Sequence, residues 1–257
     1  MLTRRLIACL DVRDGQVVKG VNFEGLRLAG DPASLARRYN ADGIDELVLL
    51  DVTATLEGRR TFLHTVQTVA QELFIPLCVG GGISSLDSAK AVFDAGADKV
   101  SINSAALRTP ELITALARLY GSQAIIVAID AAQITEHAAP GWRIFSRSGT
   151  QPETRDAVSW AREATQRGVG EILLTSIDRD GTKSGFDCAL TAAVSTAVNI
   201  PVIASGGAGT FEHFAEVYTT GRADAALAAS VFHFSEHAVS ELKQFLIDRN
   251  ISIRPYL

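Results

Sequence analysis

Three features of the sequence predict a parallel α/β fold, and within that class a single (β/α)8 barrel over residues 1–257. Short apolar or β-branched runs alternate eight times with longer segments of helical period, which is the order of elements in parallel α/β proteins. The length of 257 residues suits one eight-stranded barrel in one domain. The chain also repeats itself at a half-chain offset, which indicates approximate two-fold symmetry inside the barrel.

The predicted strands are nearly continuous in apolar character, as expected of parallel strands that are covered on both faces. The first and the fifth carry an aspartate at the carboxyl end, Asp11 and Asp130. We expect the eight strands at residues 6–12, 46–52, 75–79, 99–102, 124–129, 171–175, 201–204 and 225–227.

Capping residues mark the predicted helices between these strands. Asp31 and Thr109 each precede a proline, which suits the first helical position because it has no N–H to satisfy. Glycines close to the expected helix ends provide the left-handed conformation that often terminates a helix. These glycines are Gly43, Gly96, Gly121, Gly168 and Gly221.

The predicted loops after the strands are longer than those before them, as in a barrel whose functional face lies at the carboxyl ends of its strands. One runs over residues 13–30 and contains four glycines, so we expect it to be mobile. Another covers residues 131–155, where residues 142–145 can form a small hairpin.

The half-chain repeat joins residues of similar position in the two halves. Glu46 and Glu171 begin similar strands 125 positions apart, and Asp11 and Asp130 end similar strands 119 positions apart. The chain therefore divides into two halves of four strand–helix units, and the two aspartates are expected to act as a pair.

Charge and composition exclude several classes of protein. A net charge of −5 and an isoelectric point near 5.6 argue against a surface that binds duplex nucleic acid. No apolar segment reaches the roughly 18–20 residues that a membrane span needs, so we expect no membrane association. Three widely spaced cysteines indicate neither a disulfide framework nor a zinc site, and favour a reducing cytoplasm.

A metal site is not expected either. His233 and His237 are four residues apart, as two ligands on a helix would be, but no third ligand is evident. The sequence therefore predicts no metal and no cofactor.

Two glycine-rich turns, at residues 80–83 and 205–209, each follow a predicted strand. Glycine lets backbone N–H groups approach a phosphate, and the N-terminus of the next helix favours negative charge. The neighbouring strand ends add short polar side chains and backbone donors. Because the turns are matched in the two halves, we infer a substrate with a phosphate at each end. For one turn alone, glycine needs only to permit a tight connection.

Asp11 and Asp130 are predicted to lie between these two anchors, above an apolar interior. A low dielectric raises the pKa of a carboxyl group, and two carboxyl groups in different surroundings can serve as one acid and one base. For either residue alone, capping a neighbouring helix is an alternative role. Lys19, in the first loop, can close on a phosphate or remain solvated.

The opposite ends of the strands carry charge. Four strand-initial residues are in phase with inward positions and can form a ring of alternating charge. From the residues alone, mutual pairing that closes the core is the simpler explanation. The four are Arg5, Glu46, Lys99 and Glu171.

Taken together, these motifs resemble the cyclase subunit of imidazole glycerol phosphate synthase, a TIM barrel family of histidine biosynthesis. The resemblance implies a lyase that combines ammonia from a separate glutaminase subunit with a linear bisphosphate, the ribulosyl formimino aminoimidazole carboxamide nucleotide. The implied products are imidazole glycerol phosphate and aminoimidazole carboxamide ribotide. The motifs run essentially from end to end, at residues 8–12, 18–23, 79–83, 98–103, 175–185 and 228–234.

The resemblance also implies roles for particular residues. Asp11 and Asp130 become the general base and general acid, in an order that stays open. Lys19 closes the first loop on the substrate. The residues implied at one phosphate are Gly82, Asn103 and Ser104, and those at the other are Asp180, Gly181, Gly207, Ala229 and Ser230.

At the opposite end, the resemblance reads the charged ring as a gate for ammonia, formed by Arg5, Glu46, Lys99 and Glu171. It also implies that Asp98 contacts the glutaminase. The sequence departs from the family at Leu28 and Ala132, where an acidic and a basic residue are expected. Both departures concern loops and neither falls on a catalytic position.

Two other functions stay open. One is the sister phosphoribosyl formimino isomerase of the same pathway, a half-repeat barrel that also uses two aspartates on a bisphosphate. Residues 178–185 and 18–23 favour the cyclase. The other is a non-catalytic barrel that serves as partner of a glutaminase, which would need the charged ring but not both aspartates.

Overall fold

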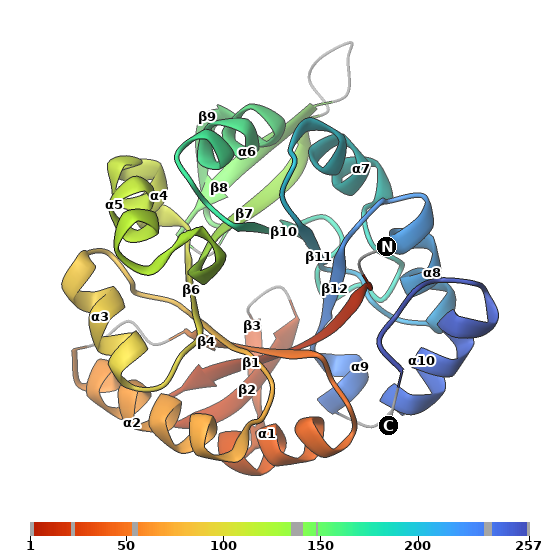
Figure 1. The fold of residues 1–257 in the computed structure, drawn as a ribbon, viewed down its shortest axis with the longest axis horizontal. Helices are drawn as coiled ribbons and strands as arrows, with labels where there is room; N and C mark the ends of the chain where they lie inside the picture. The colour runs from red at the N-terminus through yellow and green to blue at the C-terminus, as the bar shows by residue number, and fades with distance from the viewer. Residues whose placement is uncertain are drawn as a thin grey trace. The chain divides into compact units, whose positions relative to one another are not determined.

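The computed structural model describes residues 3–21, 24–52, 56–134, 141–147, 149–233 and 238–255 (Figure 1). Along this chain, eight parallel strands alternate with helices, which confirms the predicted (β/α)8 fold class. The described residues form two compact units, Met1–Ser101 with Leu227–Leu257, and Ile102–Ala226. The single domain over residues 1–257 stays a prediction.

Unit 1 is built on a parallel ladder in which β1 pairs with β4, β4 with β5, and β5 with β6. Helices α1 and α2 pack against each other and against β1 (Figure 1). The middle of β1, residues 6–10, is buried and supplies much of the core. The elements are β1 (Arg5–Arg13), α1 (Pro32–Ala41), β4 (Glu46–Asp51), α2 (Leu56–Glu72), β5 (Leu77–Gly80), α3 (Leu86–Asp94), β6 (Lys99–Ile102), α9 (Ser230–His233) and α10 (Val239–Asp248).

The first long loop is a correction to the prediction, because most of it is a hairpin. β2 (Gln16–Val21) pairs antiparallel with β1, and β3 (Glu24–Gly30) pairs with β2. The turn between β1 and β2 consists of Asp14 and Gly15, both with positive φ, of 50° and 76°. Asp-Gly is a strong signal for a two-residue hairpin turn. The assignment of this segment as a loop is therefore wrong, while its mobility stays a prediction.

Unit 2 is built on β7, which pairs with β10, and β10 pairs with β11. The predicted hairpin at residues 142–145 is confirmed and is longer than expected, since β8 pairs with both β7 and β9. The elements are α4 (Ser104–Arg108), α5 (Glu111–Tyr120), the short 3-10 helix Ser122–Ala124, β7 (Ile125–Ile134), β8 (Gly141–Ser146), β9 (Gln151–Asp156), α6 (Ala157–Gln166), β10 (Glu171–Ser176), α7 (Cys188–Ala197), β11 (Val202–Ser205) and α8 (Phe211–Thr219). The eighth parallel strand, β12 (Ala225–Ala228), crosses the boundary between the units.

The predicted helix caps are confirmed at one of the two prolines. Asp31 caps α1 by accepting a hydrogen bond from the backbone N–H of Ser34, and Pro32 occupies the first turn. The cap expected at Thr109 is wrong, because Thr109 ends α4 and its N–H donates to Ala105. Helix α5 then begins at Glu111 without a side-chain cap.

A buried ion pair attaches the last helix of unit 1 to the sheet. Lys243 of α10 donates to Asp45, 2.7 Å away, and the two side chains are 2% and 4% exposed. The second oxygen of Asp45 accepts the backbone N–H of Leu6 in β1 at 2.8 Å. Each partner therefore compensates for the desolvation of the other.

Removing one partner of this pair is expected to destabilise the fold. Lys243→Ala leaves a buried carboxylate without its cation, which typically costs about 3–5 kcal/mol. Urea unfolding of this variant should show the loss, and Gln244→Ala, on the exposed side of the same helix, should unfold like the parent chain. A loss below about 1 kcal/mol would contradict a structural role for the pair.

Within the described ranges, no helix is long and apolar enough to cross a membrane.

Candidate functional site

Asp130 is a carboxyl group of unit 2 whose pKa is raised far above its ordinary value. It lies in β7, opposite Thr175 of β10 on one side and Phe145 of β8 on the other. Burial and the negative charge of Asp180 raise its pKa from 3.8 to about 6, against the opposing effect of a hydrogen bond from Asn103. A carboxyl group that titrates so close to neutral pH can both hold and release a proton.

Three residues predicted at the site meet here. The side-chain amide of Asn103 donates to Asp130 with an N–O distance of 2.9 Å. Asp180 belongs to the segment after β10, where its backbone N–H donates to the carbonyl oxygen of Ser176 at 3.0 Å. Asn103 therefore contacts Asp130, and Asp180 acts on Asp130 through its charge, although the resemblance assigned Asn103 and Asp180 to opposite phosphates.

Asp11 has a separate environment in unit 1. Its Oδ1 lies 3.7 Å from the Cys9 thiol, which donates to it, and it pairs in register with Leu50 of β4 and Val18 of β2. Its strand continues beyond the carboxylate into an antiparallel partner, as β7 continues beyond Asp130 into β8. The half-chain repeat therefore extends to the surroundings of both aspartates, and their pairing across the two units stays a prediction.

The two glycine-rich turns have the backbone that only glycine adopts without strain. Gly81 and Gly82 have φ values of 93° and 63°, and Gly206 and Gly207 have 92° and 95°. A Cβ at Gly81 would collide with the backbone of Asp51, so close packing alone also requires glycine there. Phosphate binding by these turns stays a prediction.

The second turn supports the polar segment that follows β10. A Cβ at Gly207 would collide with the carbonyl group of Gly185, whose N–H donates to the Gly207 carbonyl oxygen at 2.8 Å. Gly181 lies in this segment with a φ of 74°. The turn therefore holds the segment that carries Asp180 in place.

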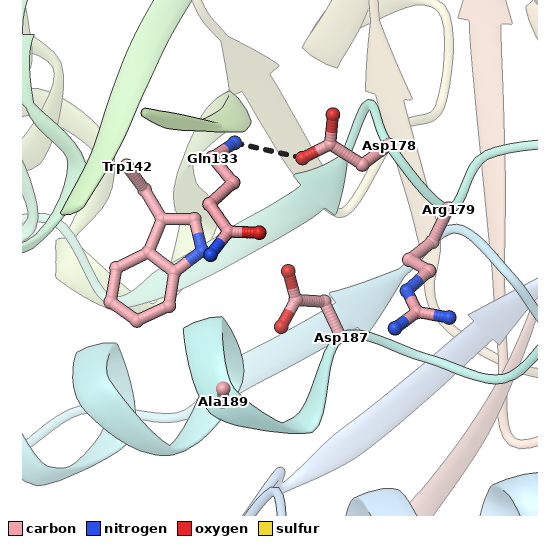
Figure 2. A pocket seen from close by; sticks show the side chains of 6 residues that line it. All are labelled: Gln133, Trp142, Asp178, Arg179, Asp187 and Ala189. Carbon is pink, nitrogen blue, oxygen red and sulfur yellow. Dashed lines mark hydrogen bonds between the residues drawn. The ribbon is translucent and has the colours of Figure 1, made fainter. Parts of the chain in front are cut away.

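A cavity of about 370 Å³ lies beside this segment and was not predicted (Figure 2). Asp178, at its edge, accepts the backbone N–H of Gln133 at 2.7 Å. Asp187 accepts the N–H of Leu190 and so caps α7. Both carboxylates therefore have structural partners. The cavity is lined by Gln133, Trp142, Asp178, Arg179, Asp187 and Ala189.

Sequence reasoning also missed a contact at the first phosphate position. The Ser104 hydroxyl accepts the backbone N–H of Arg147 at 3.0 Å, and Arg147 follows β8 with a φ of 51°.

Ala132 is a position where the family resemblance predicts a basic residue, and it lies directly opposite Arg143 in the β7–β8 ladder. The neighbouring strand thus places an arginine next to Ala132. This cross-strand pairing could not be predicted from local sequence patterns.

The remaining predicted binding residues lie in unit 1. Lys19 belongs to β2 and pairs in register with Arg27 of β3. Ala229 and Ser230 stand at the start of α9, where the carbonyl of Ala229 accepts the N–H of Phe232. Their approach to Gly207 in unit 2 stays a prediction.

Three members of the predicted charged ring are connected. Glu46, at the start of β4 and 1% exposed, accepts from Arg5 at 2.7 Å and from Lys99 at 3.0 Å. Glu171 occupies the corresponding place in unit 2, at the start of β10, and is buried. Asp98 accepts the N–H of Leu77 at 2.8 Å, a structural contact that the sequence did not reveal.

The described residues contain no group of three or more His, Cys, Asp or Glu side chains placed to hold a metal ion. His237, one of the two histidines considered for such a site, lies outside the described residues. The expected absence of a metal and of a cofactor stays a prediction.

Comparison with known proteins gives consistent matches over the whole chain. A model of the "Histidine biosynthesis protein" family matches residues 5–238. Three curated relatives carry the name "Imidazole glycerol phosphate synthase subunit HisF". The one from Acidobacterium capsulatum is 62% identical over 254 residues, covering 99% of both chains. Those from Anoxybacillus flavithermus and Chlorobium phaeovibrioides are 55% and 56% identical, each over 99% of this chain and 100% of the relative.

Proposed function

Since this chain belongs to the imidazole glycerol phosphate synthase cyclase family of histidine biosynthesis, we propose the reaction and the residues that follow. The chain is an enzyme, a lyase that combines ammonia with the ribulosyl formimino aminoimidazole carboxamide bisphosphate. The products are imidazole glycerol phosphate and aminoimidazole carboxamide ribotide. One observation supports placing this reaction at Asp130: the pKa of its carboxyl group is raised to about 6, and Asn103 donates a hydrogen bond to it.

Asp11 and Asp130 are the proton-transfer groups of this proposal. Ammonia that adds to a carbonyl carbon loses two protons on the way to an imine, and the carbonyl oxygen gains two protons to leave as water. Cleavage and ring closure again move protons between nitrogen, carbon and oxygen. A carboxyl group with a pKa near 6 exists in both forms close to neutral pH, which suits such repeated exchange.

The two phosphates of the substrate bind at the two glycine-rich turns. Backbone N–H groups at glycine approach a phosphate without a side chain in the way, and Lys19 supplies a positive charge from β2. One phosphate lies at Gly82, Asn103 and Ser104. The other lies at Asp180, Gly181, Gly207, Ala229 and Ser230.

The chain works in the cytoplasm with a glutaminase subunit, as a heterodimer that needs no cofactor or metal. Ammonia from that subunit enters at the amino ends of the strands, past Arg5, Glu46, Lys99 and Glu171, and Asp98 lies at the interface. The buried Glu46 carboxylate, held by the partly exposed Arg5 and Lys99, supports this gate, since an apolar residue would close the core without the cost of burying that charge.

Ammonium-dependent turnover tests the proposed reaction. The purified chain, given the bisphosphate and ammonium at alkaline pH, should consume the bisphosphate without any glutaminase. If it instead converts the aldose isomer of that bisphosphate and ignores ammonium, the sister isomerase is the better assignment. If it does neither and still binds a glutaminase, the non-catalytic role is correct.

The gate predicts different effects on the two nitrogen sources. Lys99→Met removes one cation from Glu46 and should lower glutamine-dependent turnover in the complex about tenfold, the scale of one lost charge contact of about 1.4 kcal/mol. Ammonium-dependent turnover should change less than twofold, because free ammonia reaches the site independently. Lys90→Met, which breaks an exposed pair with Asp94, serves as the control. Equal losses of glutamine-dependent and ammonium-dependent turnover would indicate that the charged ring only closes the core.

A further inference from the structure

Asn103 is bound to Asp130 in a manner that a helix cap does not explain. It follows β6 directly and stands at the N-terminus of α4, with φ −124° and ψ −89°. An asparagine at that position ordinarily accepts a hydrogen bond from the helix backbone. Here the side chain makes no such bond, and its amide nitrogen donates to Asp130 at 2.9 Å.

The carbonyl oxygen of the same side chain has no partner among the described residues. This Asn103 Oδ1 atom is buried. A buried acceptor without a donor destabilises the folded state, so natural proteins keep few of them. This atom lies on the side chain that holds Asp130, which points to a donor brought by a ligand.

The chemistry of a carbonyl oxygen limits what that ligand group can be. Phosphate oxygens are acceptors and carry negative charge, so they are repelled by Oδ1. Groups that present an N–H or O–H, such as an amide, an amine or a hydroxyl, match it. The Asn103 side chain therefore suits the reacting portion of the substrate better than its phosphate.

We propose that Asn103 is a positioning residue for Asp130, and that its carbonyl oxygen accepts a hydrogen bond from an N–H or O–H of the substrate next to that carboxyl group. The proposal rests on the function proposed above, and it changes the role given to Asn103 there. The amide nitrogen fixes the orientation of the carboxyl group. The carbonyl oxygen aligns the reacting atoms with it, which is how positioning groups contribute to catalysis.

The electrostatics of the pair agree with this arrangement. The Asn103 hydrogen bond lowers the pKa of Asp130, while burial and Asp180 raise it. Because donation to the ionised carboxylate favours that form, loss of the amide should raise the pKa of Asp130 further above about 6.

The test compares Asn103→Ala and the isosteric Asn103→Asp with Asn199→Ala, an exposed asparagine of the same unit. With ammonium as nitrogen source, both Asn103 variants should lose on the order of 10²-fold in kcat, as for a displaced reacting group, with affinity for the bisphosphate within threefold of the parent. Weaker binding with an unchanged kcat would make Asn103 a phosphate ligand and overturn the proposal. Asn199→Ala should match the parent chain in both quantities.

A second measurement does not depend on turnover. Carbon-13 NMR of labelled aspartate, assigned with Asp130→Asn, should show the Asp130 carboxyl group titrating at higher pH in Asn103→Ala. If both the titration and kcat are unchanged, the Asn103–Asp130 hydrogen bond only connects the start of α4 to β7, and the proposal is wrong. If the parent chain shows no turnover but the titration moves, the proposed reaction fails while the contact with Asp130 stands.

Discussion

Asn in place of Asp130 is expected to lower kcat of the ammonium-dependent reaction by about 10²–10⁴-fold, the usual contribution of a general acid or base. The amide keeps the shape of the side chain but cannot take up or release a proton. Affinity for the bisphosphate should therefore change little. Steady-state turnover and equilibrium binding measured on the same preparation separate the two effects, and near-normal turnover would remove Asp130 from the mechanism.

The same substitution should stabilise the fold at high pH. The folded-state pKa of Asp130, about 6, exceeds the ordinary value of 3.8, so the folded chain binds this proton more tightly than the unfolded chain. Below about pH 4 the group is protonated in both states, and above about pH 6 the buried charge destabilises the folded state. Asp130→Asn should thus unfold at higher urea concentration at pH 8 and like the parent near pH 4. Asp94→Asn, an exposed position, is the control.

Asn in place of Asp11 is expected to have an effect of similar size, about 10²–10⁴-fold on kcat, because one carboxyl group cannot serve as both acid and base in one step. Binding of the bisphosphate should again be retained. Asp14→Asn provides a matched control in the neighbouring turn, where φ is positive and asparagine is tolerated. Turnover by Asp11→Asn within tenfold of the parent would indicate that Asp130 acts without a partner.

Local signals were sufficient for the eight parallel strands and for the position of both aspartates on them. The apolar runs that end at Asp11 and Asp130 are buried strands, and they needed no information from distant residues. The hairpin after β1 could also have been found, since Asp14 and Gly15 are the residues that a two-residue turn requires. The prediction of a loop there relied on the number of glycines and overlooked the Asp-Gly pair that indicates a hairpin turn.

Contacts between distant residues could not be predicted from local patterns. Asn103 and Asp130 are 27 positions apart, and Lys243 and Asp45 are 198 positions apart. Nothing in the composition of either segment identifies the partner, because each contact depends on how strands and helices pack. For that reason Asn103 was assigned to a phosphate from resemblance, while the structure joins it to a carboxyl group.

The fate of isotopic nitrogen shows directly whether this chain transfers ammonia to the bisphosphate. The purified chain is incubated with the bisphosphate and ¹⁵N-ammonium, without glutaminase, and both products are examined by NMR and mass spectrometry. One ¹⁵N atom is expected in the imidazole ring of imidazole glycerol phosphate and none in the aminoimidazole carboxamide ribotide, and Asp130→Asn should transfer the label about 10²–10⁴-fold more slowly. Consumption of the bisphosphate without ¹⁵N in the imidazole product would contradict this reaction.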